Sequence, residues 1–122
     1  MASSSQARIR KLTQGMLKKK FYAVLWEGRG ADLTPHLAEH LQFMIALERD
    51  GKVFASGPFD PGKSSDGMTI LRAASAEEAR AIAARDPFVA KGIRTFQIRE
   101  WMVMEGSFGI NVNYSDRSIE IA

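Results

Sequence analysis

The order of strand-like and helix-like segments constrains this fold more than any other feature of the sequence. Between residues 20 and 104, short apolar runs rich in β-branched and aromatic residues alternate with two segments of helical spacing. The strand predictions are 20–27, 52–56, 67–72 and 93–104, and the helix predictions are 34–50 and 76–85. The order β-α-β-β-α-β predicts an α+β domain of ferredoxin-like topology, an antiparallel sheet with both helices on one face. Residues 107–122 alternate weakly and predict an extra C-terminal strand or hairpin.

Both predicted helices have recognisable ends. Thr34 followed by Pro35 is typical of an N-cap with proline at the first helical position, and Gly51 suits the C-terminal end. The segment Ser75–Glu78 has the spacing of a capping box at the start of the second helix. That helix is expected to end before Pro87, because the residue preceding a proline is disfavoured in the helical region.

Length and composition restrict the class of protein. The chain has 122 residues, near the commonest size of a single domain. It contains no cysteine, which excludes disulfides, thiol nucleophiles and cysteine-based metal sites and favours a reducing compartment. No apolar run approaches the roughly 20 residues that span a bilayer, and the N-terminus lacks the apolar core of a signal peptide. We therefore expect a soluble, cytoplasmic protein.

The positive net charge of +3 is concentrated at the N-terminus. Six of the 17 basic residues and none of the 14 acidic residues fall within the first 20 positions. The sequence therefore predicts a flexible basic tail at 1–17 and one α+β domain at 18–122. The tail could contact phosphate or anionic lipid, but the rest of the chain carries more acidic than basic residues. We expect neither a nucleic-acid partner nor a membrane partner.

The two histidines, His36 and His40, lie four residues apart on the first predicted helix. Such a pair binds zinc only with further ligands, and none is evident, so we expect no metal site. His40 is flanked by apolar residues and has two interpretations: a half-buried structural histidine, or a general base or acid. Asp86 likewise is either an ordinary Asp-Pro turn or the carboxylate that orients His40. Spacing alone leaves both alternatives open.

Three segments resemble the YciI-like, or YCII-related domain, family. Residues 40–58 are similar to its pattern of a His-Leu pair followed by a glycine, a short strand and Ser-Gly-Pro. Residues 75–79 and 86–92 are similar to its Ser-x-Glu-Glu-Ala and Asp-Pro-Phe-x-x-x-Gly patterns. The resemblance extends over residues 20–104. One departure is that Pro35-His36-Leu37 stands where many members carry an arginine shortly before the histidine.

The resemblance implies a ferredoxin-like fold of the dimeric α+β barrel superfamily and an active-site pair at His40 and Asp86. The predicted substrate-binding residues are Ser56, Gly57, Pro58 and Phe88. One characterised relative eliminates HCl from chlorinated hydroxyquinol-type aromatics, and the superfamily includes muconolactone isomerases and cofactor-free monooxygenases. We therefore expect acid–base chemistry of the lyase or isomerase type, without a cofactor, on a small organic compound such as an aromatic one. The alternative is a non-catalytic ligand-binding or structural module.

The expected partners are a small-molecule ligand and a second copy of the chain. In a ferredoxin-like domain both helices lie on one face of the sheet. A chain of this length has little left to cover the other face. An uncovered apolar sheet face favours association, so the sequence predicts a homodimer that pairs sheet to sheet.

Overall fold

The computed structural model describes residues 3–122. The contacts divide the chain into two compact units. One unit is Lys20–Met102, and the other comprises the residues before it together with Val103–Ala122. The sequence had predicted a tail at 1–17 and a domain at 18–122, and these domain bounds stay a prediction.

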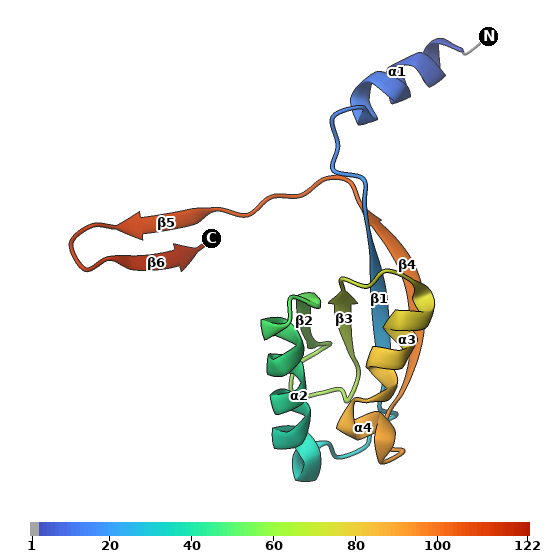
Figure 1. Cartoon of the computed structure of the whole chain (residues 1–122), viewed down its shortest axis with the longest axis vertical. Helices are drawn as coiled ribbons and strands as arrows, with labels where there is room; N and C mark the ends of the chain where they lie inside the picture. The colour runs from blue at the N-terminus through green and yellow to red at the C-terminus, as the bar shows by residue number, and fades with distance from the viewer. Residues whose placement is uncertain (1–2) are drawn as a thin grey trace. The chain divides into compact units, whose positions relative to one another are not determined.

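The larger unit is a four-stranded sheet covered by helices (Figure 1). The strands follow the order β2-β3-β1-β4, in which β3 pairs antiparallel with both β1 and β2. Its elements, in chain order, are β1 (Lys19–Glu27), the 3-10 turn η1 (Thr34–His36), α2 (Leu37–Arg49), β2 (Val53–Pro58), β3 (Gly67–Leu71), α3 (Ala76–Ala84), α4 (Pro87–Ala90) and β4 (Thr95–Val103). This arrangement confirms the predicted ferredoxin-like α+β fold.

The hydrophobic core lies between the sheet and the helices. Its buried members come from β1, β3, α2 and α3: Tyr22, Val24, Trp26, Leu47, Leu71, Ala79, Ile82 and Ala83. Side chains alternate between the two faces of a strand, so Phe21, Ala23 and Leu25 of β1 lie on the opposite face of the sheet. The helices therefore cover one face, as predicted.

The first long helix differs in detail from its prediction. Thr34 does not cap it: the chain enters through η1, whose cap is Leu33 without a side-chain hydrogen bond. The Thr34 N–H instead donates to Asp32 Oδ1 at 3.0 Å. On α2, Leu37, Leu41 and Ile45 follow one another at intervals of four residues on one face, and each keeps at least 40% of its surface exposed. The apolar stripe of α2 is thus wider than the surface that the sheet can cover.

The loop between β2 and β3 is attached to the turn that follows β1. The Gly28 N–H donates to Asp66 Oδ1 and the Gly30 N–H donates to Ser65 Oγ, both at 2.8 Å. A Cβ on Gly28 would lie 2.5 Å from the backbone oxygen of Ser65. Only glycine permits so close an approach, and it places Ser65, which is 7% exposed, inside the domain.

The described residues of the smaller unit include one helix and one hairpin. Helix α1 (Ser4–Thr13) begins with a capping box between Ser3 and Gln6, so the segment expected to be a flexible tail includes a helix. Met1 and Ala2 lie outside the described residues. Strands β5 (Ile110–Asn113) and β6 (Ser118–Ile121) form the predicted C-terminal hairpin. Within residues 3–122, no helix is long and apolar enough to span a bilayer.

Candidate functional site

His40 and Asp86 are brought together by the packing of two helices. His40 lies on α2, one turn after its start, and Asp86 lies between α3 and α4. His40 Nδ1 and Asp86 Oδ2 are 2.5 Å apart. The two residues are 46 positions apart in the sequence, so their contact could not be predicted from sequence spacing. The structure places the two predicted catalytic residues within hydrogen-bond distance.

Asp86 is fixed by the local backbone. Pro87 ends α3 and begins α4, and Asp86 is the N-cap of α4. Its Oδ1 accepts from the Phe88 N–H at 2.8 Å, and the side chain is 0% exposed. A buried carboxylate is tolerated only when its oxygens are hydrogen-bonded, and here each oxygen has a partner. The Phe88 N–H therefore holds the carboxylate independently of its contact with the imidazole.

This contact determines the orientation of the imidazole. An ionised carboxylate only accepts hydrogen bonds, so Nδ1 carries the proton that it donates to Asp86. The lone pair of the neutral ring is then on Nε2, which makes no hydrogen bond to any group within residues 3–122. The ring stacks on Phe88 at a centroid distance of 4.6 Å, and the side chain is 14% exposed. A held ring with a free Nε2 is the arrangement of a general base.

The histidine borders a cavity of about 390 Å³. Its lining residues come from β1, α2, β2 and the segment around α4: Trp26, Leu33, Leu37, His40, Leu41, Met44, Ser56, Gly57, Pro58, Phe88 and Arg94. The walls are mainly apolar with three polar side chains, which is typical of a site for a small organic molecule. The predicted substrate-binding residues Ser56, Gly57, Pro58 and Phe88 all line this cavity together with His40.

Ser56 is held by a chain of side-chain hydrogen bonds. Trp26 Nε1 donates to Thr69 Oγ1 at 2.9 Å, and the hydroxyls of Thr69 and Ser56 lie 2.7 Å apart. Thr69 is 1% exposed, whereas Ser56 lies at the cavity wall on the edge strand β2. This series of hydrogen bonds connects the core to the Ser56 hydroxyl at the cavity wall, and the buried Thr69 hydroxyl has a partner.

Arg94 is a cavity residue that the sequence analysis did not identify. It is 6% exposed, and its Nε donates to the Ser65 carbonyl at 3.0 Å. The guanidinium carbon lies 5.7 Å from the centre of the Trp26 ring and 5.2 Å from that of Phe88. Burial lowers the pKa of the Arg94 guanidinium, and the charges of Asp86 and Asp66 partly offset this effect.

His36 does not belong to this group. Its Nδ1 lies 3.9 Å from Glu39 Oε1 and makes no hydrogen bond within the described part of the chain. Among residues 3–122, no group of three or more histidine, aspartate or glutamate side chains is arranged to hold a metal ion. His36 and His40 are therefore separate features, although they lie one turn apart.

Comparison with known proteins identifies a family. The model of the YCII-related domain matches residues 20–102, which are also the larger compact unit. The chain is 35% identical to the uncharacterized protein YjpA of Bacillus subtilis (strain 168) over 66 residues. These cover 54% of this chain and 75% of YjpA.

Proposed function

Because the chain belongs to the YCII-related domain family, we propose that it is a small-molecule enzyme of lyase or isomerase type in which His40 transfers a proton. The observation that carries the proposal is the contact between His40 and the fully buried Asp86 at the wall of a mainly apolar cavity. Burial of Asp86 removes the pair from bulk water, and the position of His40 at the cavity wall allows a ligand to reach it.

The proposed step is removal of a proton from a carbon next to a carbonyl or from an aromatic hydroxyl. The Nε2 lone pair forms the new N–H bond, and the electrons of the broken bond move onto the substrate oxygen as an enolate or phenolate. Asp86 orients the ring and stabilises the imidazolium that results. Return of the proton at another atom gives isomerisation, and departure of a leaving group gives elimination. Neither course requires a cofactor.

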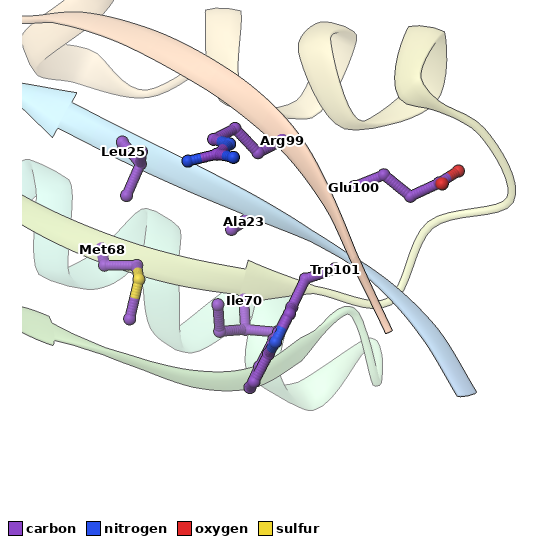
Figure 2. A pocket seen from close by; sticks show the side chains of 7 residues that line it. All are labelled: Ala23, Leu25, Met68, Ile70, Arg99, Glu100 and Trp101. Carbon is purple, nitrogen blue, oxygen red and sulfur yellow. The ribbon is translucent and has the colours of Figure 1, made fainter. Parts of the chain in front are cut away.

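We also propose that the enzyme is a homodimer that associates through the face of the sheet opposite the helices. Figure 2 shows the apolar side chains of Ala23, Leu25, Met68 and Ile70 on this face, together with the Trp101 ring and the charged side chain of Arg99. These residues line a hollow of about 330 Å³, and Trp101 is 43% exposed. A large aromatic side chain over an apolar sheet surface is typical of a protein–protein contact.

A second function is supported by the same contact. His40 joins α2 to the N-cap of α4, so the pair also fastens two helices. If that were its only role, the protein would be a ligand-binding or structural module. The two functions differ in one measurable outcome: substitution of His40 abolishes a catalysed reaction only if His40 takes part in catalysis.

The proposed function is tested by proton exchange, which does not require knowledge of the natural substrate. A panel of enolisable carbonyl compounds is incubated with the protein in D₂O, and loss of the C–H signal next to the carbonyl is followed by proton NMR. We expect exchange of at least one compound with the wild type, and a decrease of roughly 10²–10⁴-fold for His40→Gln. His36→Gln is the matched control and should exchange like the wild type. Equal exchange by His40→Gln and the wild type would contradict the proposal.

A further inference from the structure

Arg94 is a buried cation with most of its donors unused. A guanidinium has five N–H donors, and within residues 3–122 the side chain makes one hydrogen bond, from Nε to the Ser65 carbonyl. No carboxylate in that part of the chain lies within ion-pair distance of it. Arginine is rarely this buried unless it is paired, because an isolated charge is costly to remove from water.

The guanidinium is positioned by the surrounding structure. The Ser65 carbonyl holds Nε, and the rings of Trp26 and Phe88 lie beside the cationic carbon. Aromatic faces stabilise a cation in this arrangement without using its N–H donors. A Cβ on Gly67 would lie 3.3 Å from Nη2, so the absence of a side chain at Gly67 leaves room for the fork. The terminal nitrogens are thus held in place but not occupied.

The negative charges nearby are already used. Asp86 and Asp66 both attract Arg94 electrostatically. The Asp86 oxygens accept from His40 and from the Phe88 N–H, and Asp66 Oδ1 accepts from the Gly28 N–H. Neither carboxylate contacts the guanidinium. These charges reduce the cost of burying Arg94 and leave its terminal N–H groups for a ligand.

We propose that Arg94 binds the carboxylate of a small organic acid whose apolar body fills the cavity beside His40. The paired donors of a guanidinium match the two oxygens of a carboxylate. Both Arg94 and His40 lie against Phe88 and line the same cavity, with the apolar side chains of Leu41 and Met44 on the α2 side. This inference rests on the proposed acid–base function, because it supplies the substrate class for the same cavity.

The binding test uses benzoate and benzamide, which have the same shape and differ in charge. The full-length protein, labelled with ¹⁵N, is titrated with each compound, and the Trp26 indole N–H signal is followed by NMR. Trp101→Phe assigns the two indole signals. We expect benzoate to bind at least tenfold more tightly than benzamide, and more tightly than acetate, which lacks the apolar body. Equal affinity for benzoate and benzamide, or for benzoate and acetate, would overturn the proposed substrate class.

Three variants locate the binding charge. Arg94→Met and Arg94→Gln should abolish the preference for benzoate over benzamide, whereas His40→Gln should keep it. Retention of the preference without Arg94, or its loss in His40→Gln, would overturn the assignment to Arg94. If neither Arg94 variant folds by near-ultraviolet circular dichroism, the wild type and His40→Gln decide between the outcomes. Because binding is measured apart from proton exchange, either proposal can fail while the other stands.

Discussion

The Asp86 side chain makes two structural contacts, one through each carboxylate oxygen. One oxygen caps α4 through the Phe88 N–H, and the other accepts from the imidazole of His40. Both interactions are inside the domain, where an unpartnered polar group is costly. The residue that positions the proposed base is therefore also needed for local folding.

This dual role gives a prediction about stability. Asp86→Ala should lower the free energy of unfolding by about 2–5 kcal/mol, because it removes a cap and leaves a buried imidazole without its acceptor. Asp86→Asn should cost less, since its amide oxygen can still accept one of the bonds. Glu39→Gln, which breaks the exposed pair with Lys91, is the control and should give no resolvable change. Urea unfolding measures all three, and an Asp86→Ala midpoint equal to that of Glu39→Gln would contradict the prediction.

The candidate site was predictable only in part, and Arg94 shows why. His40 and Asp86 were identified from residue type and from the family resemblance, but their contact depends on how α2 packs beside α4. Arg94 was placed within a predicted strand and received no role. The available signal was its parity, because it alternates in step with Phe96 and Ile98, which pack against the core. An arginine at a core-facing position suggests a buried charge.

At the scale of elements, the sequence predicted order and type better than contacts. Turn residues and apolar periodicity located the four strands of the main sheet and the helices α2 and α3 to within a few residues, whereas helix α1 was expected to be a flexible tail. Serine at 75 caps α3 as expected, but Glu78 accepts from the Ala74 N–H instead of closing the box on Ser75. The fraction of the α2 surface that the sheet buries could not be predicted. Apolar periodicity indicates which face of a helix is turned toward the sheet, but not how wide the sheet surface is.

The attachment of the β2–β3 loop gives a prediction at this scale. Gly28→Ala should lower the free energy of unfolding by about 1–3 kcal/mol, because its Cβ would collide with the Ser65 backbone. Gly57→Ala is the matched control for stability alone: a Cβ at Gly57 would meet nothing within 4 Å, and the free energy of unfolding should stay close to that of the wild type. Since Ser65 also holds Arg94, Gly28→Ala should weaken benzoate binding as well. Thermal unfolding and the NMR titration measure the two effects, and a fully stable Gly28→Ala would contradict the argument.

At the scale of the whole molecule, the chain divides into two compact units, and the ligand site is described within one of them. Every residue that lines the His40 cavity belongs to Lys20–Met102. The hairpin in the other unit carries Ile110, Val112, Ile119 and Ile121 on one face, each more than half exposed. A two-stranded hairpin is marginally stable by itself in water, so these segments gain little stability from their own contacts.

The proposed dimer is the property of the whole molecule that is most directly testable. Trp101→Glu places a charge on the face of the sheet opposite the helices, where burial of that charge would oppose association. We expect the wild type to sediment as a dimer at micromolar concentration and Trp101→Glu to sediment as a monomer. Arg80→Glu is the control, because Arg80 is an exposed residue of α3, which packs on the opposite face. A monomeric wild type, or a dimeric Trp101→Glu with native circular dichroism, would contradict the proposed interface. Because Trp101 is not among the residues that line the His40 cavity, the monomeric variant should still prefer benzoate to benzamide.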